Sequence, residues 1–152
     1  MGSVVIRPMI AEDIPRLIEM GKDFHREATS YHPFVFSEEK LISLGYQILD
    51  DFNFMCLVHE GGEIDGMIAG AIYEQFFSFD LTAAELFLFV DKSRRGAVIG
   101  KRLVSAFEMW ATSRGAREIR VGVSSGITPD RTVGFYEHLG YHRTAIQLRK
   151  VL

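Results

Sequence analysis

The chain carries one cysteine among its 152 residues, and this scarcity excludes an internal disulfide framework. Cys56 stands in an apolar run, so we interpret it as a buried small hydrophobic residue rather than as a nucleophile. The cysteine and the five histidines show no metal-ligand spacing, and we therefore predict no metal site.

Long apolar runs and an excess of basic residues are also lacking. No apolar stretch reaches the length that crosses a bilayer, and the N-terminus has no basic segment followed by an apolar one, so neither membrane insertion nor secretion is indicated. The net charge of -3 contrasts with the broad basic face of a nucleic-acid binder. We expect a cytoplasmic protein that binds neither nucleic acid nor membrane.

The composition is that of an ordinary globular protein, with 47% hydrophobic and 24% charged residues. A chain of this length buries about two-thirds of its unfolded surface, which is enough to form a core. The sequence shows no repeat, linker or low-complexity tract, so a single domain over residues 1–152 is expected.

The hydrophobic pattern alternates between the periods of strands and of helices. Extended segments are expected at 4–7, 53–60, 64–73, 81–90, 118–123 and 141–151. Helices are expected at 11–24, 38–49, 100–114 and 131–139, with Ser37 and Asp130 as N-caps of the second and the fourth. Gly61 and Gly62 predict a hairpin, and Gly115 predicts a helix end. The sequence thus indicates a mixed α/β fold.

The most informative stretch is 87–101, FLFVDKSRRGAVIGK, in which an apolar strand-like run enters an amphipathic helix through a basic turn that contains glycine. A helix start presents unpaired N–H groups and a partial positive charge, so this junction is suited to a pyrophosphate, with Arg94, Arg95 and Lys101 adding charge. Alternatively, it is an ordinary strand-helix junction. A P-loop is excluded because Arg102 follows Lys101 where a Ser or Thr is required.

Three motifs, in order along the chain, resemble the GNAT superfamily of acetyl-CoA-dependent N-acyltransferases. They are IRPMIAEDIPRL, FVDKSRRGAVIGKRLV and RTVGFYEHLGY, and the likeness runs nearly from end to end. The resemblance implies a GNAT-like mixed α/β (α+β) fold, in which about four helices flank a central, mostly antiparallel, splayed sheet of about six to seven strands.

The resemblance also implies acetyl-CoA as the acetyl donor. In the family's pyrophosphate signature Arg95 takes the first place and Gly100 the last, but Val98 replaces the middle glycine. A β-branched residue is strained at positive φ; in helical geometry its N–H still faces phosphate, and Gly96 absorbs the turn. The implied cofactor contacts are Leu88, Phe89, Val90, Arg95, Gly96, Ala97, Val98, Ile99, Gly100, Lys101, Ser125 and Thr132.

The implied reaction is direct transfer of the acetyl group to a primary amine, which needs a base for the amine proton. Glu85, in an apolar strand, is the candidate base or an ordinary edge residue, and Glu74 is a weaker second choice. Glu85 lies one residue away from the position of the family's glutamate. Its side chain would therefore point to the opposite face of the sheet unless a β-bulge intervenes. Tyr136 matches the family tyrosine beside the cofactor sulfur; alternatively, it is a core aromatic.

The implied acceptor is an amine-bearing small molecule or a peptide N-terminus, which enters beside the irregular aromatic segment 25–36. His25, His32 and Tyr31 are candidate contacts there, or ordinary surface and core residues. A homodimer is compatible with the family. Two alternatives remain open, namely a catalytically idle acyl-CoA-binding or regulatory domain of the same fold and a structural module without a pocket.

Overall fold

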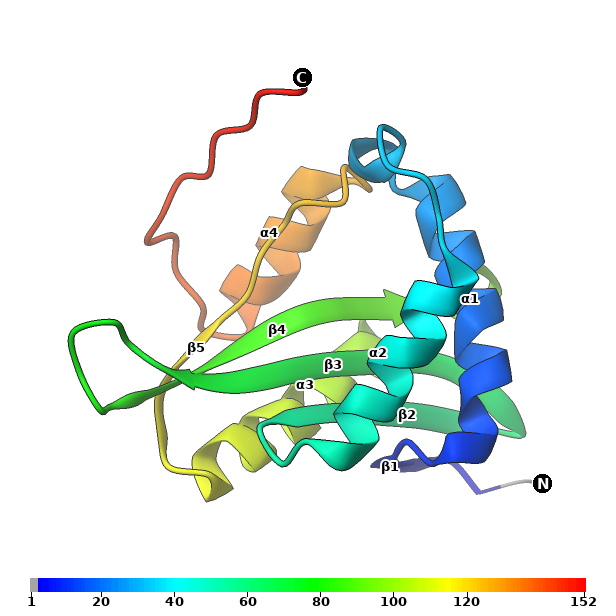
Figure 1. Ribbon diagram of the computed structural model, residues 1–152, viewed down its shortest axis with the longest axis horizontal. Coiled ribbons are helices and arrows are strands. Elements are labelled where there is room, and N and C mark those ends of the chain that lie inside the picture. The colour runs from blue at the N-terminus through cyan, green and yellow to red at the C-terminus, as the bar shows by residue number, and fades with distance from the viewer. Residues whose placement is uncertain (1–2) are drawn as a thin grey trace.

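The computed structural model describes residues 3–152 and contains a five-stranded sheet with helices on both faces (Figure 1). The strand order is β1 (Val5–Pro8), β2 (Phe54–Gly61), β3 (Glu63–Glu74), β4 (Leu81–Val90) and β5 (Ala116–Arg120). Strands β1 to β4 pair antiparallel, whereas β5 runs parallel to β4. The expected mixed α/β fold with a mostly antiparallel central sheet is confirmed.

Within residues 3–152, four α-helices cover the sheet: α1 (Ile14–Glu27), α2 (Glu38–Asp50), α3 (Ala97–Ser113) and α4 (Pro129–His138). Short 3-10 turns occur at Ala11–Asp13, Thr29–Tyr31 and Lys92–Arg94. Helices α1 and α2 lie on one face of the sheet and α3 lies on the other (Figure 1). None of the helices described is long and apolar enough to span a membrane.

A side-chain cap and two glycines explain where several helices and strands begin or end. The Ser37 hydroxyl accepts a hydrogen bond from the Lys40 N–H at 3.2 Å, which confirms the expected N-cap of α2. Gly62, at a φ of 97°, closes the hairpin between β2 and β3, and Gly115, at a φ of 80°, follows the end of α3. Both backbones lie in the left-handed region that favours glycine, so these two expectations are confirmed.

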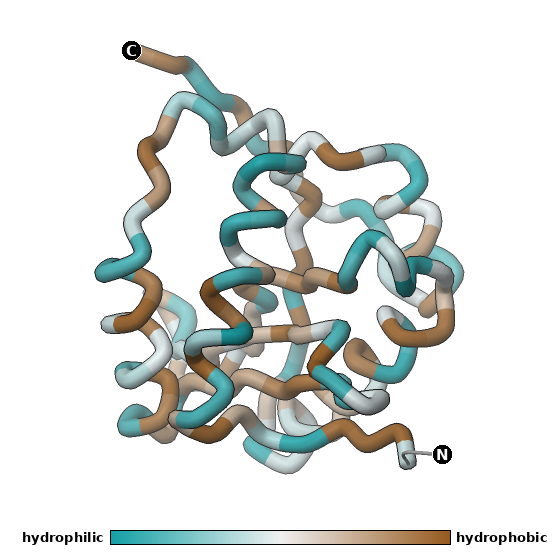
Figure 2. Tube along the Cα trace, turned by 90° about the vertical axis from the view of Figure 1, so that its right-hand side faces the viewer, coloured by the Kyte–Doolittle hydropathy of each residue, from teal (hydrophilic) through white to brown (hydrophobic). Residues whose placement is uncertain are grey.

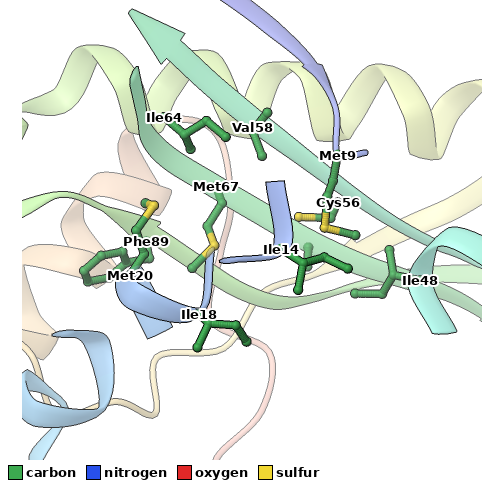
Figure 3. Packing of buried hydrophobic residues seen from close by; sticks show 11 residues of the cluster. Met9, Ile14, Ile18, Met20, Ile48, Cys56, Val58, Ile64, Met67 and Phe89 are labelled. Carbon is green, nitrogen blue, oxygen red and sulfur yellow. The ribbon is translucent and has the colours of Figure 1, made fainter. Parts of the chain in front are cut away.

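Two apolar cores lie on the two faces of the sheet. On the α1 and α2 side, Ile18 and Met20 pack with Met67 of β3 (Figure 3). Cys56 belongs to this core and is 5% exposed, which confirms its buried role, and burial raises the pKa of its thiol to about 12. On the other side, Phe107 of α3 packs against the sheet. Brown and teal segments alternate along the helices in Figure 2, as expected of helices that each bury one face.

Two β-bulges change the direction of side chains near the site. The extra residue is Asp65 in β3, and it is Leu86, between Glu85 and Phe87, in β4. Successive side chains of a strand point to opposite faces, so one inserted residue reverses the alternation on either side of it. The β-bulge that would let Glu85 face the same side as the family's glutamate is therefore present, at Leu86.

Strands β4 and β5 separate along their length. Their pairing covers residues 81–84 of β4 and 116–120 of β5, whereas β4 continues to Val90. Beyond Ala84, the edge of β4 that faces β5 therefore has no strand partner among the described residues. This is the splay that the family resemblance implied.

The expected number of strands, about six to seven, is wrong for residues 3–152, since the sheet has five. The segment 142–152 forms no strand and leaves α4 as an exposed tail (Figure 1). Ile146 and Leu148 alternate with polar residues as in a strand, but each is 90% exposed. The alternation indicates a strand-like segment without providing a neighbouring strand to bond its backbone.

Two smaller expectations are also corrected. Asp130 is not the N-cap of α4, because the helix begins at Pro129 and Thr128 takes the N-cap position. Proline at the first helical position has its φ already fixed near the helical value, which accounts for the earlier start. Strand β5 covers Ala116–Arg120 rather than 118–123, since the chain leaves β4 after Arg120.

We predict that Gly70 tolerates no larger side chain. A Cβ there would lie 2.4 Å from Cε2 of Phe107, a fully buried ring. Gly70→Ala should lower the free energy of unfolding in urea by about 1 to 3 kcal/mol. In Gly134→Ala, the control in α4, the new Cβ meets no atom within 4 Å, so stability should rise by about 0.5 to 1 kcal/mol. A Gly70 variant as stable as the wild type would contradict this packing.

Candidate active site

A cavity of about 800 Å³ opens where β4 and β5 separate. Residues 85–90 of β4 form one wall, and residues 122–125 together with α4 contribute the opposite one. The first turn of α3 and the end of α1 supply further lining. The volume falls within the range of about 300 to 1,000 Å³ that is usual for small-molecule sites.

The structure brings together twelve of the fourteen residues that the sequence singles out as site residues. They line the cavity from β4, the first turn of α3, the segment after β5 and α4: Glu85, Leu88, Phe89, Val90, Arg95, Gly96, Ala97, Gly100, Lys101, Ser125, Thr132 and Tyr136. Their roles toward a ligand stay predictions.

Val98 and Ile99 do not line the cavity. Both lie in the first turn of α3, where Val98 is 60% exposed and Ile99 is buried against Gly66 of β3. Val98 is helical and not at a positive φ, so replacing the family's glycine strains no backbone. Gly96 is the N-cap of α3, and a Cβ there would meet no atom within 4 Å. Open space therefore lies next to the unpaired N–H groups of the helix start.

The bulge at Leu86 determines the direction of Glu85. Ala83 packs on the α3 side of the sheet, and Glu85, two residues further on, shares that side. After the bulge, Phe87 and Phe89 belong to the core on the α1 side instead. The inserted residue thus separates Glu85 from these two rings and leaves its carboxyl facing α4 across the cavity.

Glu85 is half-buried and accepts a hydrogen bond from the Gly122 N–H at 3.4 Å. Burial raises the pKa of this carboxyl to about 7, because the charged form is poorly solvated, and the Gly122 contact offsets the effect only in part. A carboxyl with a pKa near 7 exchanges its proton readily at neutral pH, as a general base must.

Tyr136 of α4 is 4% exposed and lies near Glu85. Burial, and next the charge on Glu85, raise the pKa of the phenol well above its usual range, so Tyr136 keeps its proton. The ring packs against Phe135 and Tyr141, with centroid distances of 5.1 and 5.4 Å. The side chain is therefore a core aromatic that also lines the cavity.

Four cationic side chains line the cavity: Lys92, Arg95 and Lys101 in or near the start of α3, and Arg131 in α4. Arg95 forms an ion pair with Glu27 of α1, and its Nε donates to the Val90 carbonyl at 3.0 Å. The hydrogen bond from the Arg95 guanidinium lowers the pKa of the Glu27 carboxyl. The pair links the end of α1 to the turn before α3.

Sequence reasoning missed Glu27 and Arg131 as lining residues. Arg131 begins the third family motif, so its place beside Thr132 was a usable signal. Glu27 lies 68 residues before Arg95, and nothing in the local sequence connects the two.

The aromatic segment 25–36 contributes Tyr31 to the cavity, and the Tyr31 hydroxyl lies 3.2 Å from Oγ of Ser124. His25 and His32 do not line the cavity; each contacts a backbone carbonyl within the same segment. Glu74, the second candidate base, is exposed at the end of β3 and outside the lining. Among residues 3–152, no cluster of three or more histidine, cysteine or carboxylate side chains could hold a metal ion.

Comparisons with known proteins bear on the same region. Residues 21–141 match the family model described as "Acetyltransferase (GNAT) family". The chain belongs to the GNAT acetyltransferase family. The matched residues include β4, α4 and the turn that precedes α3, and these segments line the cavity of this GNAT protein. The comparison with curated proteins gave no match.

Solved structures share the fold over almost the whole chain. An acetyltransferase from Trypanosoma brucei is 20% identical, with a TM-score of 0.76 over 99% of this chain and 100% of its own. An aminoglycoside acetyltransferase from an uncultured soil metagenomic sample, in complex with sisomicin, is 21% identical. Its TM-score is 0.74 over 98% of this chain and 96% of its own. Glucosamine-6-phosphate N-acetyltransferase from Arabidopsis thaliana is 19% identical, with a TM-score of 0.75 over 98% of this chain and 98% of its own. At these identities the likeness establishes the fold.

The raised pKa of Glu85 predicts a pH-dependent stability difference between the wild type and Glu85→Gln. The unfolded carboxyl titrates near 4.5 and the folded one near 7, so the folded state binds more protons between these values. Wild-type stability should therefore fall as the pH rises through this window, whereas the neutral glutamine does not titrate. At pH 8 the variant should be more stable by about 1 to 3 kcal/mol, and at pH 4 the advantage should vanish.

Thermal unfolding at pH 4, 6 and 8 measures this difference. Glu74→Gln, at an exposed position, is the matched control and should show no comparable trend. A constant offset between Glu85→Gln and the wild type across the range would contradict the buried carboxyl.

Proposed function

We propose that this GNAT protein transfers the acetyl group of acetyl-CoA directly to a primary amine. The observation that carries the proposal is the presence, in one cavity, of a carboxyl with a pKa of about 7 and a phenol that keeps its proton. A base of this pKa can take a proton from an amine, and a phenol can give one to a departing thiolate. Amide formation from a thioester needs both transfers.

The residues of the cavity fit acetyl-CoA. The start of α3, with Gly96 at the N-cap, offers unpaired N–H groups beside open space; Lys92, Arg95 and Lys101 lie in or next to it, and Arg131 of α4 lines the same cavity. These groups would hold the pyrophosphate. The open edge of β4 would contact the pantetheine arm through backbone groups of Leu88, Phe89 and Val90, and Ser125 and Thr132 lie in the remaining lining.

Bound acetyl-CoA would supply an activated thioester carbonyl. Glu85 accepts the proton of the amine, directly or through water, while the nitrogen bonds to the acetyl carbon. A backbone N–H on the open edge of β4 donates to the carbonyl oxygen, where negative charge develops. Tyr136 gives its proton to the sulfur as the carbon–sulfur bond breaks, and it is reprotonated from Glu85, which balances the reaction.

The acceptor is an amine-bearing small molecule or a peptide N-terminus. Support for an amine comes from the fold, which is shared with an aminoglycoside acetyltransferase and with glucosamine-6-phosphate N-acetyltransferase. The side of the cavity lined by Phe24, Tyr31 and Ser124 would receive it. The single domain over residues 1–152, the cytoplasmic location and the homodimer stay predictions from the sequence.

We predict that Glu85 and Tyr136 are needed for turnover and not for cofactor binding. Glu85→Gln should lower kcat roughly 100-fold or more, and Tyr136→Phe roughly 10- to 100-fold, because each variant keeps its shape and loses a proton transfer. The dissociation constant for acetyl-CoA should stay within about threefold. CoA release with a panel of primary amines measures kcat, and calorimetry measures binding.

Matched controls are Glu74→Gln and Tyr46→Phe, since both residues are exposed and lie outside the cavity. Both should behave as the wild type. Tight binding of acetyl-CoA without CoA release on any amine would favour the catalytically idle acyl-CoA-binding domain. Failure to bind acetyl-CoA at all would exclude both functions.

A further inference from the structure

His59 of β2 and Asp65 of β3 form a buried pair that the proposed reaction does not use. Nδ1 of His59 lies 2.5 Å from Oδ1 of Asp65, and the two side chains are 2% and 6% exposed. Both lie on the α3 side of the sheet. A Cβ added at the neighbouring Gly66 would contact Cβ of His59 at 3.5 Å and the Ile99 side chain of α3 at 2.9 Å.

Fold stability alone gives no reason for a histidine at position 59. Its buried Nε2 has no hydrogen-bond partner within the described part of the chain. Because a carboxylate can only accept, Nδ1 of His59 is the donor in this pair. A buried polar atom without a partner costs free energy that an apolar side chain would not. The one hydrogen bond that the His59 side chain makes, to Asp65, is what an apolar side chain could not supply.

The bulge of β3 places Asp65 beside His59. Ile64 and Met67 both belong to the core on the α1 side, although they are three residues apart. The inserted residue therefore lets Asp65 and Gly66 face α3 in succession. The backbone geometry of the bulge therefore keeps the Asp65 side chain on the α3 side of the sheet, in addition to its hydrogen bond with His59.

Asp65 is joined to the turn that leads into α3. Its carbonyl accepts from the Asp91 N–H at 2.8 Å, and its Oδ2 lies 3.4 Å from Nε of Arg94. The Arg94 N–H in turn donates to the Asp91 carbonyl at 2.8 Å. The turn Lys92–Arg94 is thus tied to Asp65 at both ends, and two residues later Gly96 caps α3.

Arg16 of α1 strengthens the same junction. Its Nε donates to the Ile64 carbonyl at 3.0 Å, and its guanidinium pairs with the Asp91 carboxylate at 3.3 Å. The bulge of β3 is therefore the point to which the segment 91–94 is anchored.

We propose that His59 and Asp65 are positioning residues, which fix the turn 91–96 and through it the N–H groups at the start of α3. The identity of the ligand that these groups hold, the pyrophosphate of acetyl-CoA, rests on the proposed function. The His59 N–H holds the Asp65 carboxylate in one orientation, so that Oδ2 stays directed at Arg94. Loss of this hydrogen bond frees the carboxylate to rotate and loosens the turn.

Two substitutions at position 59 separate this role from packing. His59→Leu fills the space without a donor, whereas the side-chain amide of His59→Asn can present an N–H where Nδ1 lies. In the protein without ligand, His59→Leu should speed hydrogen exchange of the Asp91 and Arg94 amides roughly tenfold, and His59→Asn should keep both within about threefold of the wild type.

With acetyl-CoA, His59→Leu should raise the KM and the dissociation constant for acetyl-CoA roughly tenfold, while kcat and the KM for the amine stay within about threefold. His59→Asn should restore both constants. The control for lost stability is Thr82→Val, because Thr82 is a buried polar residue that bonds Gln75 and Glu118 and lies outside the cavity. It should lower the Tm and leave the KM for acetyl-CoA unchanged.

Wild-type exchange and affinity in His59→Leu would overturn the inference. It would also be overturned if affinity followed the Tm in every variant, Thr82→Val included. If the wild type itself does not bind acetyl-CoA, the proposed function fails, and the exchange data still decide whether His59 fixes the turn. Should His59→Leu not fold, Arg94→Gln removes the exposed end of the same chain of contacts and should produce the same faster exchange at Asp91.

Discussion

The separation of β4 from β5 is the constraint on which the site depends. A strand edge inside a fold leaves backbone groups without partners, a condition that is unfavourable unless water, a side chain or a ligand satisfies them. Here β5 departs after Arg120, so the edge of β4 from residue 85 onward faces a cavity instead of a strand. Helix α4 fills the wedge only in part, with Tyr136 as its one buried side chain. The open edge and the partly filled wedge together make the cavity.

The two bulges act in a similar way on two acids. In each strand one inserted residue resets the alternation, so that Asp65 lies beside His59 and Glu85 faces Tyr136. The environments then differ. Asp65 has a histidine and an arginine as partners, whereas Glu85 has only a backbone N–H at 3.4 Å among its assigned hydrogen bonds. A carboxylate with partners is suited to hold a turn, and one with few partners is suited to take up a proton.

The sequence predicted most of the strands and helices because those segments carry clear periods and end signals, such as Ser37, Gly62 and Gly115. Twelve of the fourteen site residues that it predicted line the cavity, and most of them lie in family motifs that are continuous in sequence. What it could not predict depends on pairing between distant segments. The bulge at Leu86 is a property of the register of β4 on β3, and the contact of Glu27 with Arg95 joins α1 to α3. The tail 142–152 shows the reverse case, in which a strand-like pattern finds no strand to pair with.

Cationic side chains line the cavity, yet the charge state of Glu85 does not depend on them. Lys92, Arg95 and Lys101 lie in the turn before α3 or in its first residues, and Arg131 lies in α4, yet none of the four contributes to the pKa of Glu85, which burial and the Gly122 N–H determine. A cation near Glu85 would lower that pKa and weaken the carboxylate as a base. The same apolar surroundings keep Tyr136 protonated, and the charge on Glu85 reinforces this effect. Burial therefore raises the pKa of both adjacent side chains, which brings the Glu85 carboxyl to a pKa of about 7 and keeps the Tyr136 phenol protonated.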